Sequence, residues 1–145
     1  MRKILFFAIA LVAGVLAFTS CEKNDPNAIK GIKFCCDLDR GQTPVREYLY
    51  FGEKDDFEWG MEVYEDQERT KMTSAFGDYG TYVLNEEQQH IDMTFTGSFN
   101  VSEGQRTNHD GQASHKNGRW NYRFDGDTIF ITAENGATSK YWRLK

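Results

Sequence analysis

The chain has 145 residues and a formal net charge of −5, with 22 acidic against 17 basic side chains. This length favours a single domain that buries roughly two-thirds of its unfolded surface. The acidic balance argues against nucleic acid or an anionic membrane surface as a partner, because both require a basic footprint.

The first 21 residues have the pattern of an export signal. Met1-Arg2-Lys3 precedes an apolar run from Ile4 to Phe18, which is shorter than a membrane span. Phe18-Thr19-Ser20-Cys21 resembles a bacterial lipobox, in which the cysteine is lipidated and becomes the new N-terminus. The resemblance implies that lipid on Cys21 anchors the protein in the bacterial outer membrane, since several acyl chains together hold a protein firmly. The alternative is an ordinary secretory signal that contains a cysteine by chance.

Three segments follow from this interpretation. Residues 1–20 are a signal peptide, residues 21–29 a lipidated tether, and residues 30–145 the folded domain. Removal of the signal takes out Arg2 and Lys3 and no acidic residue, which leaves a net charge of −7. The acidic, polar residues after Cys21 resemble a signal for the outer leaflet, so we expect the cell surface, with the periplasmic face as the alternative.

The rest of the chain alternates apolar and polar residues with a period of two, which is typical of half-buried strands. Polar turns separate most of these runs, and Asp125-Gly126 between two of them predicts a hairpin. The pattern predicts strands over residues 30–39, 45–51, 57–64, 69–76, 79–84, 90–96, 119–124, 127–132 and 139–144. Eight or nine consecutive strands predict an all-β fold, with an antiparallel up-and-down β-barrel of about eight strands favoured over a two-sheet β-sandwich.

Residues 100–118 interrupt this pattern. They are polar, contain glycine and have few apolar anchors. A structureless segment of this length is unusual inside a compact domain, so we expect a long loop that is either functional or disordered.

Two parts of the chain resemble small bacterial lipocalin-like domains. The middle carries Gly80-Thr81-Tyr82-Val83-Leu84 and Ile91-Asp92-Met93-Thr94, and the end carries Trp120-Asn121-Tyr122, residues 126–131 and residues 141–145. The family's Gly-x-Trp near the first strand is missing, and Lys30-Gly31-Ile32-Lys33 stands there instead. The resemblance implies a calyx that holds a small apolar molecule, and it implies no enzymatic activity.

Large side chains on the apolar strand faces are the candidate ligand-binding residues. In a barrel of about eight strands they either fill the interior or surround one small ligand. These candidates are Phe34, Trp59, Met61, Phe95, Trp120 and Tyr122. The alternative function is to bind a glycan or protein partner through residues 100–118 or through aromatic residues on the opposite faces. The opposite faces carry Tyr48, Tyr50, Tyr64 and Phe130.

The sequence predicts neither a catalytic site nor a metal site. His109-Asp110 and His115 lie in the polar residues 100–118. Metal ligands need a fixed geometry, which a polar segment that contains glycine does not favour. Glu58 and Glu62 share one strand face, but about 13 Å separates such positions, which is too far for the carboxylate pair of a glycosidase. Serine-hydrolase, zinc-protease and phosphate-loop motifs are missing from the sequence. We therefore expect a non-catalytic protein without a cofactor.

Cys35 and Cys36 are neighbours in the chain. On a strand their side chains point to opposite faces, so a disulfide between them would need a strained turn. We expect Cys36 to be buried as a small apolar side chain and Cys35 to face outward.

Overall fold

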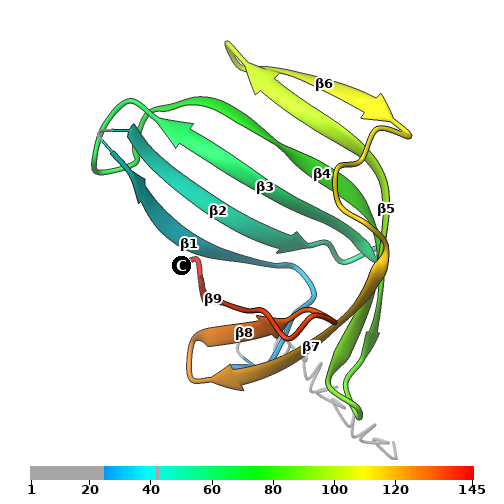
Figure 1. Cartoon of the computed structure of the whole chain (residues 1–145). Helices are drawn as coiled ribbons and strands as arrows, with labels where there is room; N and C mark the ends of the chain where they lie inside the picture. The colour runs from blue at the N-terminus through cyan, green and yellow to red at the C-terminus, as the bar shows by residue number, and fades with distance from the viewer. Residues whose placement is uncertain (1–24, 42) are drawn as a thin grey trace, which may run out of the picture.

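The alternating runs form nine β-strands in the part of the chain that the structure describes, residues 25–41 and 43–145 of a computed structural model (Figure 1). The predicted signal segment and Cys21 lie outside these described residues. Within the described ranges, no helix is long and apolar enough to cross a membrane. The strands are β1 (Ile32–Arg40), β2 (Thr43–Phe51), β3 (Asp56–Tyr64), β4 (Met72–Asn85), β5 (His90–Ser102), β6 (Gln105–Asp110), β7 (Gly118–Asp125), β8 (Thr128–Thr132) and β9 (Thr138–Arg143).

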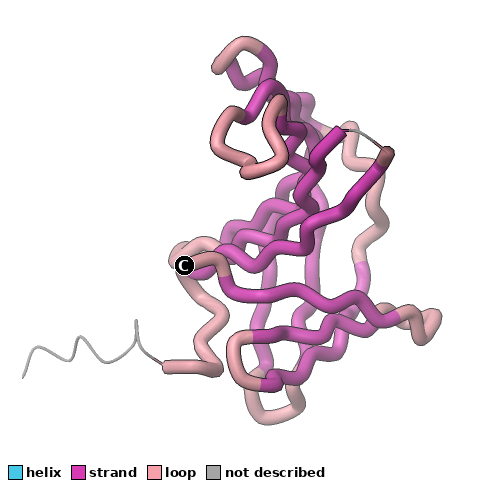
Figure 2. The backbone as a smooth tube through the Cα atoms, turned by 90° about the vertical axis from the view of Figure 1, so that its left-hand side faces the viewer, coloured by secondary structure: helices cyan, strands magenta, loops and turns pink. Residues whose placement is uncertain are grey.

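Eight of these strands close into a ring. Antiparallel pairs run in the order β1-β2-β3-β4-β5-β7-β8-β9, and β9 returns to β1 through the register Cys35↔Trp142. The predicted all-β class and the barrel-like, antiparallel arrangement of about eight strands are therefore confirmed, in one curved sheet rather than two stacked ones (Figures 1 and 2). The hairpin predicted at Asp125-Gly126 is also present, because Asp125 pairs with Thr128 across the turn from β7 to β8.

Strand β4 corrects the prediction of two strands broken at Gly77-Asp78. It runs for 14 residues without interruption and pairs with β3 through Gly60↔Gly77 and Trp59↔Asp78. A residue with a side chain cannot replace Gly77, because its Cβ would lie 2.3 Å from the Trp59 carbonyl oxygen. Glycine therefore permits the close approach of two backbones instead of ending the strand.

The predicted loop over residues 100–118 is largely a β-hairpin. Strand β5 continues to Ser102 and turns through Glu103 and Gly104, both at positive φ, into β6. Two central turn residues with positive φ suit the right-handed twist of the two strands. Only residues 111–117 connect β6 to β7 without strand structure. Sequence reasoning missed this hairpin because β6 is almost entirely exposed and polar, so it lacks the alternation that marks a half-buried strand.

A β-bulge in β5 decides which side chains of the hairpin point into the ring. Gly80 pairs with Phe95 and Tyr79 with Gly97, so Thr96 is the extra residue. Before the bulge, Phe95 points inward. After the bulge, Ser98 and Asn100 point inward and Phe99 points to the outer face of the sheet.

One end of the ring is filled by side chains, and we call it the closed end. Ile29, only 2% exposed, enters this core from the segment before β1, and the backbone N–H of Gly31 donates to the Phe51 carbonyl at 2.7 Å. Aromatic edges pack closely there, as in the 5.1 Å contact between Phe51 and Tyr82. The buried core residues are Ile29, Phe34, Leu49, Phe51, Phe57, Tyr82, Ile91, Met93, Phe95, Trp120, Tyr122, Ile129, Ile131 and Tyr141.

A second, smaller cluster covers the outer face of the sheet. Cys35 lies in it and is fully buried, whereas Cys36 points into the ring and is only partly buried. The two cysteines point to the predicted faces, but Cys35 is the more buried one because the outer cluster covers it. Outer strand faces are covered by long cationic side chains, with Lys33 Nζ 4.1 Å from the centre of the Tyr48 ring.

Candidate functional site

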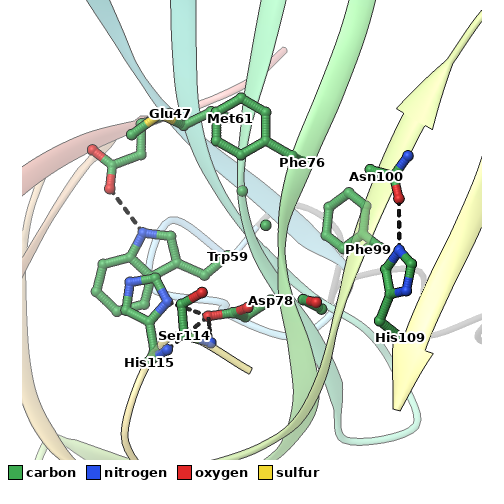
Figure 3. A pocket seen from close by; sticks show the side chains of 13 residues that line it. Glu47, Trp59, Met61, Phe76, Asp78, Phe99, Asn100, His109, Ser114 and His115 are labelled. Carbon is green, nitrogen blue, oxygen red and sulfur yellow. Dashed lines mark hydrogen bonds and ion pairs between the residues drawn. The ribbon is translucent and has the colours of Figure 1, made fainter. Parts of the chain in front are cut away.

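A cavity of about 440 Å³ lies at the end of the ring opposite the closed end, which we call the open end (Figure 3). Strands β2 to β6 and the 111–117 loop surround it. The lining residues are Glu47, Trp59, Gly60, Met61, Phe76, Gly77, Asp78, Ser98, Phe99, Asn100, His109, Ser114 and His115.

Strand register explains why these residues meet. Inward positions on neighbouring strands form rows across the sheet, and each row takes one residue from each strand. One row runs through Glu47, Met61, Phe76 and Asn100, and the row beside it runs through Trp59, Asp78, Ser98 and His109. The glycines Gly60 and Gly77 contribute backbone to the cavity wall instead of side chains.

Asp78 fixes the 111–117 loop to the wall of the ring. Its side chain is 2% exposed, and its Oδ2 accepts hydrogen bonds from the backbone N–H groups of Ser114 at 2.9 Å and His115 at 2.8 Å. The same oxygen lies 2.6 Å from His115 Nδ1. A carboxylate only accepts, so Nδ1 is the ring nitrogen that carries the proton. Three donors on Oδ2 offset part of the cost of burying the charge and hold the loop in one place.

His115 forms the floor of the cavity above the filled core. Its ring stacks on Trp59, with ring centres 4.7 Å apart and planes 17° apart, and on Phe95 at 5.1 Å and 19°. The indole Nε1 of Trp59 donates to Glu47 Oε1 at 2.8 Å, and the Tyr141 hydroxyl donates to the same oxygen at 3.1 Å. Burial, followed by the nearby Glu47 carboxylate, raises the pKa of Tyr141, so the hydroxyl stays protonated and available as a donor.

The sequence-predicted ligand residues divide between the two ends of the ring. Trp59 and Met61 line the cavity. The other four, Phe34, Phe95, Trp120 and Tyr122, belong to the buried core, where Phe95 supports the His115 ring from below the cavity.

Sequence reasoning missed the polar half of the site. The signal for Glu47 was present, because the alternation in β2 places this charged residue on the same face as Val45 and Leu49. Asp78 followed a glycine and was interpreted as a strand break, and no sequence pattern links it to His115, which lies 37 positions away. Strand pairing decides that Phe76, Ser98 and residues of β6 point inward, and no sequence pattern predicts that pairing.

His109, Asp110 and His115, which the sequence analysis considered as metal ligands, each have a different partner. His109 Nε2 lies 2.8 Å from Asn100 Oδ1, and Asp110 accepts from the Tyr79 hydroxyl, while His115 pairs with Asp78. These side chains therefore do not converge on one point.

Glu58 and Glu62 face outward, away from the cavity. The Tyr48 hydroxyl donates to Glu58 at 3.2 Å, and Arg106 forms an ion pair with the same carboxylate at 2.6 Å. Glu62 pairs with Lys33 and accepts from the Tyr64 hydroxyl. Both carboxylates thus belong to the packing of the outer surface.

The outward aromatic residues are also less available than their strand positions suggested. Tyr48 and Tyr64 are 5% and 8% exposed. Phe130 is partly buried, with the Arg123 guanidinium 3.7 Å from its ring centre, and Tyr50 is partly buried beside the outer cluster.

The cavity thus combines apolar walls with hydrogen-bond acceptors that are held in place before any ligand arrives. Trp59, Met61 and Phe76 supply the apolar surface, and Glu47 and Asp78 supply the fixed carboxylates. Comparison of the sequence with models of protein families and with curated proteins gives no match.

Proposed function

We propose that this protein binds a small, largely apolar molecule in the cavity at the open end and does not transform it. The observation that carries the proposal is the cavity itself, whose volume of about 440 Å³ lies in the range of small-molecule sites. Apolar walls with a few fixed polar groups are the usual composition of such sites. Because hydrogen bonds already hold Trp59 and His115, a ligand has little side-chain entropy to remove.

We further propose that the protein is a lipid-anchored lipoprotein of the bacterial outer membrane with a lipocalin-like domain. The lipobox-like residues that end at Cys21 and the sequence resemblance support this part of the proposal. The position of the site is compatible with it, because residues 25–31 lie at the closed end of the ring (Figure 1). The residues that line the cavity lie at the other end. A domain tethered through residues 25–31 would present its cavity away from the bilayer.

The alternative, a glycan or protein partner held by outward aromatic residues, has less support from the structure. Tyr48 and Tyr64 are buried, and Phe130 lies under Arg123. Residues 100–118, the other candidate surface, contribute Asn100, His109, Ser114 and His115 to the cavity.

Titration of the purified protein with the neutral apolar dye N-phenyl-1-naphthylamine tests the proposal. We expect saturable binding at one site per chain, accompanied by a change in tryptophan fluorescence because Trp59 lines the cavity. Met61→Trp should fill the cavity and weaken binding at least tenfold. Val83→Trp is the matched control, because Val83 is 67% exposed and lies outside the cavity, so binding should be unchanged. Binding that never saturates, or that Met61→Trp leaves intact, would contradict the proposal.

A further inference from the structure

The hydrogen bonds around the cavity leave one oxygen of each carboxylate without a partner. At Asp78 all three donors reach Oδ2, and within the described residues no hydrogen bond reaches Oδ1. Asp78 is 2% exposed and lines the cavity, and its Oδ1 is not among the buried atoms that lack a partner. This oxygen can therefore accept a hydrogen bond from a ligand.

Glu47 shows the same division. The Trp59 indole and the Tyr141 hydroxyl both donate to Oε1, at 2.8 Å and 3.1 Å, and no described residue donates to Oε2. Figure 3 shows Oε2 on the side of the carboxylate that turns away from the Trp59 indole. Glu47 thus contacts the edge of the Trp59 indole and Asp78 the edge of the His115 ring, and each carboxylate keeps one oxygen outside these hydrogen bonds (Figure 3).

His115 contributes a further polar atom. Its Nδ1 faces Asp78, which leaves Nε2 outside this contact. The His115 side chain is 41% exposed, which leaves the ring accessible from the cavity.

Cationic side chains do not balance these acceptors. Of the described residues that line the cavity, none is lysine or arginine. Cations of the lining strands β2 and β6 are engaged on the outer face, where Arg46 pairs with Asp37 and Arg106 with Glu58. An anionic ligand such as a fatty acid would bring its carboxylate next to two others without a counter-charge, which is unfavourable at low dielectric constant.

We propose that the ligand is a small organic amine, an ammonium group attached to an apolar or aromatic body. The Glu47 and Asp78 carboxylates attract the ammonium, and the body lies against Trp59, Met61 and Phe76. The inference rests on the proposed function, because it specifies the ligand class for the same cavity. Charge-assisted hydrogen bonds are the stronger kind, so the head group rather than the apolar body decides which ligands are selected.

Three probes with one body and different head groups test this inference: 3-phenylpropylamine, 3-phenylpropanol and 3-phenylpropionate. Calorimetric titration of the purified protein at low salt should give an affinity for the amine at least tenfold above that for the alcohol, with the carboxylate weakest. Low salt is used because screening weakens the charge contribution.

Glu47→Gln should reduce the preference for the amine over the alcohol by about tenfold. The Gln amide oxygen can still accept from Trp59 and Tyr141, so the variant keeps its fold while the charged acceptor is lost. Glu134→Gln is the matched control, because Glu134 is exposed and lies outside the cavity. It should leave the preference unchanged.

The possible results separate the two proposals. Equal or tighter binding of the alcohol or the carboxylate would overturn the amine inference and leave the cavity as a binding site. A preference for the amine that Glu47→Gln and Glu134→Gln reduce equally would also overturn it. If none of the three probes binds, and N-phenyl-1-naphthylamine does not bind either, both proposals fail.

Discussion

Replacing Asp78 with alanine should detach the 111–117 loop from the wall of the ring. The substitution removes the acceptor of two backbone N–H groups and of His115 Nδ1. A hydrogen bond to a charged group contributes about 1.5–3 kcal/mol, but burying the carboxylate costs several kcal/mol, and the freed loop can be hydrated. We therefore expect the free energy of unfolding to fall by about 2–4 kcal/mol.

Urea denaturation measures this loss, and Asp92→Ala provides the comparison. Asp92 is also a strand aspartate with a hydrogen-bonded partner, Arg119, but both side chains are well exposed, at 41% and 53%. Exposed ion pairs contribute at most about 1 kcal/mol. Asp92→Ala should therefore cost far less than Asp78→Ala.

A double-mutant cycle with His115→Ala isolates the side-chain pair from the backbone contacts. Because the two side chains are in direct contact, we expect a coupling energy of about 1 kcal/mol or more. Hydrogen exchange should show that the Ser114 and His115 amides lose protection in Asp78→Ala. The reasoning would be refuted if Asp78→Ala cost no more than Asp92→Ala, or if the Asp78 and His115 substitutions were simply additive.

Two further predictions concern the sheet and its turns. Gly80→Ala should lower the free energy of unfolding by about 2–4 kcal/mol, because its Cβ would lie 1.9 Å from the Thr94 carbonyl oxygen. Gly118→Ala, whose Cβ would have no neighbour closer than 3.5 Å, should cost under about 1 kcal/mol, and equal losses in urea denaturation would count against the close-approach argument. Hydrogen bonds from the Thr70 backbone N–H, and then from its hydroxyl and the next amide, lower the pKa of Asp66 to about 2. The unfolded chain binds this proton at higher pH, so the stabilisation is present above about pH 4 and is lost as the pH falls toward 2. Asp66→Ala should make the urea midpoint less dependent on pH over that interval, and an unchanged slope would contradict the assignment.

The strands were predictable because their signal is local. In β3, for example, Phe57, Trp59 and Met61 alternate with polar or small residues, and the burial of one strand face imposes that period on the sequence. The turn at Asp125-Gly126 was readable for the same reason, since Gly126 has the positive φ that such a turn requires. The all-β class and the approximate number of strands followed from these patterns.

Signals with two physical meanings misled the prediction. Gly77 was interpreted as a break, but it allows two backbones to approach closely within the continuous strand β4. Strand β6 is stabilised by pairing with β5 and not by burial, so its exposed sequence resembles a loop.

The sequence by itself determined the strand periodicity, the antiparallel order and the export-like N-terminal pattern, because each depends on residues close together in the chain. Only the tertiary structure decided which inward residues fill the core and which line a cavity. That division depends on contacts between distant segments: the bulge at Thr96 turns Ser98 inward, and Asp78 holds His115 from 37 positions away. Strand pairing around the ring and the packing of the 111–117 loop create the cavity. Neither produces a periodic pattern in the sequence.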